Sequence, residues 1–337
     1  MSKKRDQPGV KYLHQKTIVI TGASSGAGLA TALEFAKYRC TLVLAARRME
    51  ALERVVAQCK DMGASVIAVK TDVTNAGEVH RLATAAIDFS GNIDVWVNNA
   101  GVLAAGEFDS TPLEVHDQVI RTNLMGYLHG AHAVLPYFKE QGYGVLINNI
   151  SVGGWMPVPY GAAYSASKFG IRGFSEALRG ELGKWPDIHI CELYPAFLDT
   201  PGIQHAGNFT GKILKPAPPV YDPRRVARAM VSLAQRPRRS TTIGSVATLL
   251  RLSHFITSTL TIALTARVME TYLKQAEPVS STTGNLFYSD GQDTLIDGGW
   301  QEQFKPSKKT IATAVLTAAL ATGLFIWRQT AKRKQVI

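Results

Sequence analysis

Short apolar runs alternate with amphipathic stretches over the first two thirds of the chain. Seven runs rich in Val and Ile are predicted to be strands, at residues 17–21, 41–46, 65–70, 93–100, 144–151, 188–194 and 240–246. These runs are almost continuously apolar, as strands covered on both faces are. Stretches with helical periodicity lie between them. Repeated strand-then-helix units predict an α/β fold, a Rossmann-type doubly wound parallel sheet in a single domain with a C-terminal helical extension.

A second helical pattern follows the last predicted strand. Apolar side chains recur every three or four residues over 247–274, which predicts one or two helices; they are Leu249, Leu252, Ile256, Leu260, Leu264 and Val268. Arg251, His254 and Arg267 interrupt the pattern, so we do not expect it to span a bilayer. Packing against the core is the simpler explanation of this apolar stripe. A substrate lid or a membrane-surface element is the alternative.

These patterns divide the 337 residues into four segments. They are a basic N-terminal arm (1–15), a Rossmann-fold domain (16–246), a helical and loop extension (247–304) and a candidate transmembrane helix (310–327). Residues 311–327 carry no charge, and as a helix they would span about 26 Å, close to a hydrocarbon core of roughly 30 Å. Lys and Arg flank both ends, where their charges can reach the interfaces. A soluble packing helix is the alternative, because Ala and Thr dominate the segment.

The net charge of +11 is concentrated at the two ends of the chain. Residues 1–16 carry +4 and residues 301–337 carry +6, which leaves +1 for residues 17–300. Basic ends suit an anionic membrane surface. A nucleic-acid-binding protein would be expected to carry the charge on its folded body, so no nucleic-acid partner is expected. The sequence therefore predicts a membrane protein with a single C-terminal anchor.

Cysteine usage and the N-terminus both indicate a reducing compartment. Cys40, Cys59 and Cys191 are far apart and form no CxxC motif, so neither a metal site nor a disulfide framework is expected. Residues 1–16 carry charge but no apolar run of the kind found in secretory signals. We therefore expect the catalytic domain to be cytoplasmic.

A glycine-rich stretch follows the first predicted strand and opens the first predicted helix. Gly22, Gly26 and Gly28 would allow a tight turn, a close backbone approach and packing of helix on strand. The N-terminus of the helix would direct its N–H groups at a pyrophosphate. Hydroxyl groups are added by Thr21, Ser24 and Ser25. The stretch predicts a dinucleotide-binding site.

The residues after the second predicted strand indicate which dinucleotide is bound. A carboxylate that binds the ribose 2′-hydroxyl is expected about twenty residues after the glycines. The chain has Arg47 and Arg48 there instead. A guanidinium can pair with a 2′-phosphate, which a carboxylate would repel. NADP(H) is therefore favoured over NAD(H), and a solvated pair of loop arginines is the alternative.

A Tyr–Lys pair lies in a predicted helix rich in Ala and Ser. Tyr164 and Lys168 are four residues apart and share one helix face. A nearby ammonium favours the phenolate and lowers the pKa of a tyrosine from about 10. Such a tyrosine can donate and accept a proton near neutral pH. For the pair alone, a surface Tyr beside a solvated Lys is the alternative.

In combination, the motifs of this chain resemble those of the short-chain dehydrogenase/reductase family, across nearly all of residues 14–240. They are TGASSGAG (21–28), TDVTN (71–75), NNAG (98–101), NLMG (123–126), INNISVGG (147–154), YSASK (164–168) and YPAFLDT (194–200). Ala196 stands where the family usually has Gly. Besides the residues above, the resemblance implies cofactor contacts at Asp72, Val73, Asn99, Ala100, Gly101, Tyr164, Lys168, Pro195 and Thr200.

The resemblance implies a catalytic set of Asn123, Ser151, Tyr164 and Lys168. Tyr164 would be the general acid in reduction and the general base in oxidation, and Lys168 would lower its pKa and hold the nicotinamide ribose. Ser151 would hydrogen-bond the substrate oxygen, and Asn123 would support a water chain to Lys168. The implied activity is hydride transfer between NADP(H) and a carbonyl or secondary alcohol.

The expected substrate is hydrophobic, because the loop after Ser151 carries Trp155, Met156 and Tyr160 as candidate apolar walls. Ser151, Trp155 and Tyr164 are the expected substrate-binding residues. With a membrane tail, a lipid, steroid, retinoid or similar carbonyl is a reasonable substrate. A homodimer or homotetramer is the expected assembly.

Two other functions are compatible with a nucleotide-binding fold. A non-catalytic redox sensor or scaffold at a membrane would be expected to lack the Tyr, Lys or Ser, and all three are present. A sugar-nucleotide epimerase or dehydratase usually has a larger C-terminal substrate domain than the roughly 100 residues that follow the last predicted strand. Both are therefore less favoured than the dehydrogenase.

Overall fold

The computed structural model describes residues 13–288 and 294–303 of the chain. The chain divides into two compact units, Met1–Trp300 and Gln301–Ile337. The predicted membrane span at 310–327 and most of the predicted 1–15 arm lie outside the described residues. Within the described ranges, no helix is both long and apolar enough to cross a membrane.

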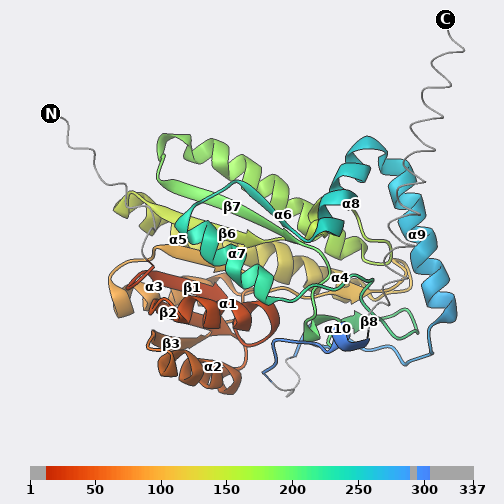
Figure 1. Cartoon of the computed structure of the whole chain (residues 1–337), viewed down its shortest axis with the longest axis horizontal. Helices are drawn as coiled ribbons and strands as arrows, with labels where there is room; N and C mark the ends of the chain where they lie inside the picture. Colours follow the sequence, from red (N-terminus) through yellow and green to blue (C-terminus); the bar gives the residue numbers. More distant parts are fainter. Residues whose placement is uncertain (1–12, 289–293, 304–337) are drawn as a thin grey trace, which may run out of the picture. The chain divides into compact units, whose positions relative to one another are not determined.

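Seven parallel strands form the central sheet in the order β3-β2-β1-β4-β6-β7-β9 (Figure 1). They are β1 (Thr17–Thr21), β2 (Thr41–Ala46), β3 (Ser65–Lys70), β4 (Val95–Asn98), β6 (Gly144–Asn149), β7 (Ile188–Pro195) and β9 (Ser240–Ile243). The predicted doubly wound parallel sheet is thus confirmed. Three strands are shorter than predicted, at 93–100, 144–151 and 240–246. In the first two, the residues after the strand form loops at the carboxyl edge of the sheet.

Helices cover both faces of the sheet, with α1, α2 and α7 on one face and α3, α5 and α6 on the other (Figure 1). Their bounds are α1 (Gly26–Ala36), α2 (Met49–Asp61), α3 (Ala76–Ser90), α5 (Gly126–Gln141), α6 (Ala162–Glu181) and α7 (Arg224–Gln235). A further helix, α4 (Leu113–Ile120), packs against α6. Successive side chains of a strand point to opposite faces. On β1, Ile18 and Ile20 pack under α1, whereas Val19 packs in the other core layer. The strands are continuously apolar because both layers need apolar side chains.

Shorter elements connect the layers. They are the π-helical η1 (Arg121–Met125), the 3₁₀ turns η2 (Val152–Gly154), η3 (Leu182–Lys184) and η4 (Pro201–Ile203), the strand pair β5 (Ala104–Ala105) and β8 (Gly207–Asn208), and α10 (Trp300–Gln303). The turn η2 follows β6 directly, and η4 follows β7 by a few residues. Both lie at the carboxyl edge of the sheet, where the loops that follow the strands gather.

The predicted helical pattern at 247–274 forms two helices, α8 (Ser245–Ile256) and α9 (Ser258–Gln275), at the periphery of the first unit (Figure 1). The core-packing explanation of its apolar stripe is wrong. Each of the six side chains that define the stripe is more than half exposed. In α8 the buried residue is Ala247, and in α9 it is Thr261. The stripe is left outside because α7 already packs against β7 and β9, and α8 makes its inward contacts through Ala247 and Leu250 on another side of the helix.

Candidate active site

The loops that follow β1, β4 and β6 surround a cavity of about 430 Å³. The strand order reverses between β1 and β4, and such a switch point leaves a crevice at the carboxyl ends of the strands. Most of the predicted site residues line this cavity: Gly22, Ser24, Ser25, Gly26, Gly28, Arg47, Arg48, Asp72, Val73, Asn99, Ala100, Gly101, Ser151, Tyr164, Lys168, Pro195 and Thr200. The structure therefore brings together residues that are almost 180 positions apart in the chain.

The glycines form a cradle that side chains would fill. Gly22 has a φ of +66°, and a Cβ on it would lie 2.7 Å from the Cα of Ala100. A Cβ on Gly28 would collide with the carbonyl oxygen of Gly22 and lie 2.6 Å from Asn99 Nδ2. The loop after β1 is therefore packed directly on the loop after β4. Because α1 begins at this cradle, its N-terminal N–H groups can meet the pyrophosphate of a dinucleotide.

Thr21 lies behind this cradle, outside the cavity wall that the described residues form. Its buried Oγ1 accepts hydrogen bonds from the N–H groups of Asn99 (3.0 Å) and Ala100 (3.2 Å) and donates to the carbonyl of Val97 (3.2 Å). Thr21 Oγ1 thus braces two loops, and a cofactor contact at Thr21 stays a prediction. The hydroxyl is used up by the backbone of the neighbouring strand.

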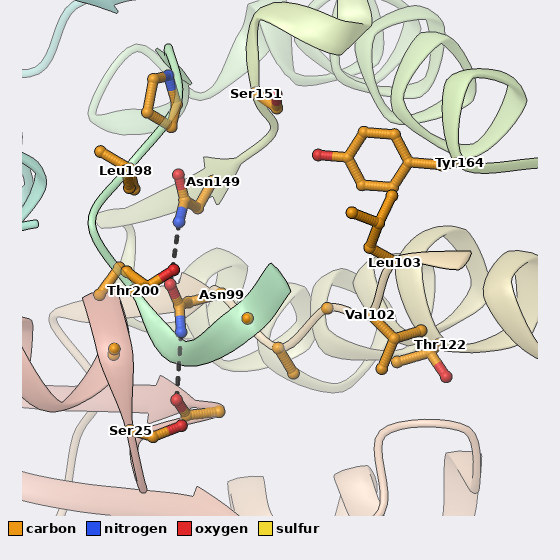
Figure 2. Close-up of a pocket in the computed structure, with 18 of the residues that line it drawn as sticks. Ser25, Asn99, Val102, Leu103, Thr122, Asn149, Ser151, Tyr164, Leu198 and Thr200 are labelled. Atoms are coloured by element: carbon orange, nitrogen blue, oxygen red, sulfur yellow. Dashed lines mark hydrogen bonds between the residues drawn. The ribbon is translucent and has the colours of Figure 1, made fainter. Parts of the chain in front are cut away.

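Asn149 is a lining residue that sequence reasoning missed. Its Nδ2 donates to Asn99 Oδ1 (2.9 Å), and Asn99 Nδ2 donates to the carbonyls of Thr21 (3.0 Å) and Gly22 (3.2 Å), as Figure 2 shows in part. This chain of amides ties the ends of β1, β4 and β6 together. The available signal was the pair of Asn residues at the end of an otherwise apolar strand.

Ser151 and Tyr164 approach each other across the cavity (Figure 2). Ser151 follows β6 with a φ of +118°, a backbone conformation that costs about 1–3 kcal/mol outside glycine and is typical of functional sites. Its Oγ accepts a hydrogen bond from the N–H of Gly153 (3.1 Å). Burial raises the pKa of Tyr164, and a hydrogen bond with the Ser151 side chain acts in the opposite direction. The strained turn therefore aims one hydroxyl at the other.

Lys168 lies one helical turn after Tyr164 and is buried. Its Nζ is 5.6 Å from the centre of the Tyr164 ring and 5.2 Å from that of Tyr127. Burial lowers the pKa of Lys168 to about 7. The sequence predicted a lowered pKa for Tyr164, whereas the structure raises it. The physical reason is that burial dominates, and an amine with a pKa near 7 carries only part of its charge at neutral pH.

The buried amine gives a testable pH dependence of stability. The unfolded chain binds a proton on Lys168 up to a pKa of about 10.4, whereas the folded chain releases it above about 7. Between these values the free energy of unfolding should gain about 1.4 kcal/mol per pH unit from this group alone. The contribution is smallest at and below pH 7 and grows as the pH rises.

Lys168→Met removes this dependence, so the variant should be more stable than the wild type at pH 7, and its advantage should shrink towards pH 9. The difference between the two proteins is the relevant quantity, because burial raises the pKa of Cys40 and Cys59 to about 12 and their thiols therefore ionise in this pH range only in the unfolded chain. Urea unfolding at several pH values measures it. A difference that stays constant with pH would contradict a depressed pKa at Lys168.

Asn123 lies in the π-helical turn η1, behind the cavity wall formed by the described residues. Its Nδ2 donates to the carbonyl of Val102 (2.9 Å) and to Ser167 Oγ (3.3 Å), and its Oδ1 accepts from the N–H of Val102 (2.8 Å). Turns of this kind often occur at functional sites. Here the side chain connects the loop after β4 to α6, which carries Tyr164 and Lys168. Its role in a water chain stays a prediction.

The arginines expected to hold a 2′-phosphate both line the cavity. Arg47 also donates to three backbone carbonyls of one later segment, those of Asn285 (2.6 Å), Leu286 (3.2 Å) and Phe287 (3.4 Å). The structure therefore gives Arg47 a second task that the sequence did not indicate. Arg48 begins α2 as its N-cap residue.

Residues 295–300 also bond to loops at the carboxyl edge of the sheet. The N–H of Gly26 donates to the carbonyl of Leu295 (2.8 Å), and Asp199 Oδ1 accepts from the N–H groups of Gly298 (3.0 Å) and Trp300 (2.8 Å). These bonds tie residues far along the chain to the cofactor loops that follow β1 and β7. Contacts between positions about 100 or more residues apart leave no local pattern in the sequence.

The expected apolar walls are only partly where the sequence placed them. Met156 lines the cavity, whereas Trp155 and Tyr160 lie outside the wall that the described residues form. The ring of Trp155 is instead stacked between the guanidinium groups of Arg172 (3.4 Å) and Arg251 (3.8 Å). Arg172 lies on α6 and Arg251 on α8, so these two helices hold the Trp155 ring between them. The apolar lining comes from Leu103, Met156, Val158, Phe197, Leu198, Ile203 and Leu250.

Comparison with known proteins extends over almost the whole chain. The family model described as short chain dehydrogenase matches residues 16–209. The uncharacterized oxidoreductase YxnA of Bacillus subtilis (strain 168) is 32% identical over 326 residues, which cover 94% of this chain and 91% of that protein. The similarity to YxnA therefore includes much of the region beyond the family model.

Two solved structures share the fold. An alcohol dehydrogenase from the archaeon Thermococcus sibiricus, complexed with 5-hydroxy-NADP, has a TM-score of 0.60 and 28% identity, and the match covers 69% of this chain and 97% of that one. A single-residue variant of the actinorhodin polyketide ketoreductase, solved with NADPH, has a TM-score of 0.62 and 27% identity, covering 68% of this chain and 95% of that one. Both neighbours are complexes with a nicotinamide dinucleotide phosphate or its derivative.

Proposed function

Because this chain belongs to the short-chain dehydrogenase family, whose members are oxidoreductases acting on CH–OH groups with NAD(P), we propose that it is an NADP(H)-dependent carbonyl reductase or secondary-alcohol dehydrogenase for a hydrophobic substrate. One observation carries the proposal. Ser151, Tyr164 and Lys168 lie in the same cavity as the glycine cradle. A sensor or scaffold would not need a strained serine opposite a buried tyrosine.

The residues of the cavity can divide the chemistry among them. A bound nicotinamide cofactor would supply or accept the hydride, held by the glycine cradle and by Asp72 and Asn99. In reduction, the Tyr164 hydroxyl donates its proton to the substrate oxygen, and the Ser151 hydroxyl donates a hydrogen bond to the same atom. In oxidation, both interactions act in reverse. A Lys168 amine with a pKa of about 7 can exchange a proton with its surroundings near neutral pH.

Several features support a hydrophobic substrate. Besides Ser151 and Tyr164, the cavity is lined by the apolar side chains of Met156, Val158 and Leu250. Apolar walls with a few convergent polar groups are typical of small-molecule sites. Measuring NADPH consumption with a panel of ketones of increasing apolar surface tests this directly. Consumption that is highest with small, polar ketones would contradict the proposal.

Cofactor preference is the second part of the proposal. A guanidinium bonded to a phosphate contributes about 1.5–3 kcal/mol, so Arg48→Gln should weaken NADPH binding roughly 10- to 150-fold and leave NADH binding almost unchanged. Fluorescence titration with both cofactors measures the two affinities. Arg54→Gln is the matched control on α2, since Arg54 is exposed and bonds Thr294 Oγ1 (2.9 Å) rather than lining the cavity. A wild type that binds NADH more tightly than NADPH would overturn the preference.

The cellular setting stays a prediction. We propose that segment 310–327 anchors the chain in a membrane, with the catalytic domain in the cytoplasm, and that the enzyme is a homodimer or homotetramer. The uncharged run between Lys309 and Arg328 supports the anchor. No nucleic-acid partner is proposed, because residues 17–300 carry a net charge of only +1.

A further inference from the structure

The helices α8 and α9 form an arm, residues 245–275, whose apolar side chains face solvent, whereas those of an ordinary surface helix pair face the core. On α8 the outward side chains are Leu249, Leu252, Phe255 and Ile256, and on α9 they are Leu260, Leu264 and Val268. Phe255 is 85% exposed and Leu264 is 62% exposed. Soluble proteins seldom expose an apolar surface of this extent unless it binds something.

The arm cannot bury this surface by rotating its helices, because polar contacts fix the inward sides. On α8, Arg251 stacks on the Trp155 ring and donates to Ser240 Oγ (3.2 Å). On α9, the Tyr272 hydroxyl donates to the carbonyl of Ile213 (2.6 Å). Rotating either helix would break these contacts and turn Arg251 or Tyr272 away from its partners.

Positive charge accompanies the apolar surface. Residues 236–275 contain six Arg or Lys and one Glu, a net charge of +5. The other residues between 17 and 300 together carry −4, because the whole of that range is +1. Arg236, Arg238 and Arg239 are exposed, and they lie next to Ser240, which α8 contacts through Arg251. The arm and its approach are therefore a cationic, apolar region on a mildly acidic body.

We propose that the 245–275 arm docks on an anionic lipid surface, with its apolar stripe among the acyl chains and the adjoining Arg236, Arg238 and Arg239 at the headgroups. Helices that combine an exposed apolar face with basic side chains bind membranes in this way. A second copy of the chain would suit the apolar face as well. It would, however, bring two regions of charge +5 together, whereas anionic lipid complements them.

Because the arm lies against the cavity, docking on lipid also bears on how a substrate reaches the site. Leu250 of α8 lines the cavity, and Met156, another lining residue, contacts Thr265 of α9, with 3.9 Å between its sulfur and the hydroxyl. The apolar end of the cavity therefore lies against the docking arm. Entry of the substrate from the lipid rests on the proposed function, because it requires a hydrophobic substrate. The docking itself does not rest on it.

A fluorescent reporter on the full-length chain tests the docking separately from any anchoring by other segments. Phe255→Cys and Leu264→Cys place a thiol on the exposed stripe, and the three native cysteines are buried, so labelling is selective. Thr84→Cys on the exposed side of α3 is the matched control. An environment-sensitive dye should shift to the blue at the two arm sites, and not at Thr84, when vesicles of phosphatidylcholine and phosphatidylglycerol are added. Lipids carrying a quencher in the acyl chain should quench only the arm sites.

Charge reversal tests the choice of lipid. Arg238→Glu with Arg239→Glu should reduce the shift on anionic vesicles several-fold, whereas Lys60→Glu with Arg81→Glu, the same charge change on exposed residues of α2 and α3, should not. Arm sites that stay in a polar environment on vesicles would overturn the proposal. So would a blue shift without vesicles that grows with protein concentration, because a second copy would then cover the stripe. An equal shift at Thr84 would also overturn it.

Discussion

Replacing Tyr164 with Phe should lower turnover by roughly 10²- to 10⁴-fold, the range that general acid–base catalysis contributes. The phenol lies across the cavity from Ser151, and both hydroxyls converge on the place where a substrate oxygen would lie. The substitution removes one oxygen and leaves the ring against Gly153, where a Cβ would already approach Tyr164 within 3.1 Å. Cofactor affinity should therefore stay almost unchanged. Steady-state kinetics together with cofactor titration separates the two quantities.

Two further variants make this result specific. Tyr160→Phe removes a phenol of the same loop region that lies outside the described cavity wall, and it should leave turnover within about twofold. Lys168→Met should weaken both turnover and cofactor binding, because the amine is expected to touch the ribose as well as the tyrosine. Equal and small effects of Tyr164→Phe and Lys168→Met would contradict the roles proposed for them.

The sheet could be predicted from sequence because burial on two faces demands continuous apolar runs. Ile18, Val19 and Ile20 each fill one of the two core layers, so no polar residue interrupts the run. The strand ends were harder to predict. The strand in the run 93–100 ends at Asn98, and beyond it the Asn99 N–H donates to Thr21 Oγ1 and Asn99 Nδ2 donates to the Thr21 carbonyl. An Asn at this position is compatible both with a continuing strand and with a loop, and only its tertiary contacts decide where the strand ends.

The site could be predicted where its chemistry depends on local spacing, and less well where it depends on distant partners. Tyr164 and Lys168 meet because they share one helix face, which the sequence contains. Trp155 was expected in the cavity, and its place is decided by Arg172 and Arg251, which lie on two other helices. The same holds for Arg47, whose carbonyl partners lie about 240 positions away.

The apolar stripe of 247–274 illustrates a different limit. Periodicity predicted one or two helices here, and the structure has two, since a spacing of three and four residues is a property of the helix itself. It could not identify what covers the apolar face. Arg251, which interrupts the apolar pattern, and Thr261 turn inward, and Phe255 turns outward. A helix that docks on lipid and one that packs on a core have the same pattern.

Gly28→Ala should weaken cofactor binding by roughly 5- to 100-fold, since overpacking costs about 1–3 kcal/mol and the strain falls on the cofactor loop. The added Cβ would collide with the carbonyl oxygen of Gly22 and lie 2.6 Å from Asn99 Nδ2. Neither neighbour can move freely. The first is backbone in a turn of positive φ, and the second donates to the carbonyls of Thr21 and Gly22. Relief of the collision must therefore open the cradle.

The melting temperature distinguishes this collision from the ordinary effect of replacing Gly with Ala inside a helix. Ala in a helix is favoured over Gly by about 1 kcal/mol, so a Gly28→Ala substitution without a clash should raise the melting temperature. Gly173→Ala is the matched control, because Gly173 lies inside α6 and a Cβ there would meet no atom within 4 Å among the described residues. We expect the melting temperature to rise for Gly173→Ala and to fall for Gly28→Ala. A Gly28→Ala protein that is more stable and binds NADPH normally would show that the loops after β1 and β4 are not packed as closely as the cradle requires.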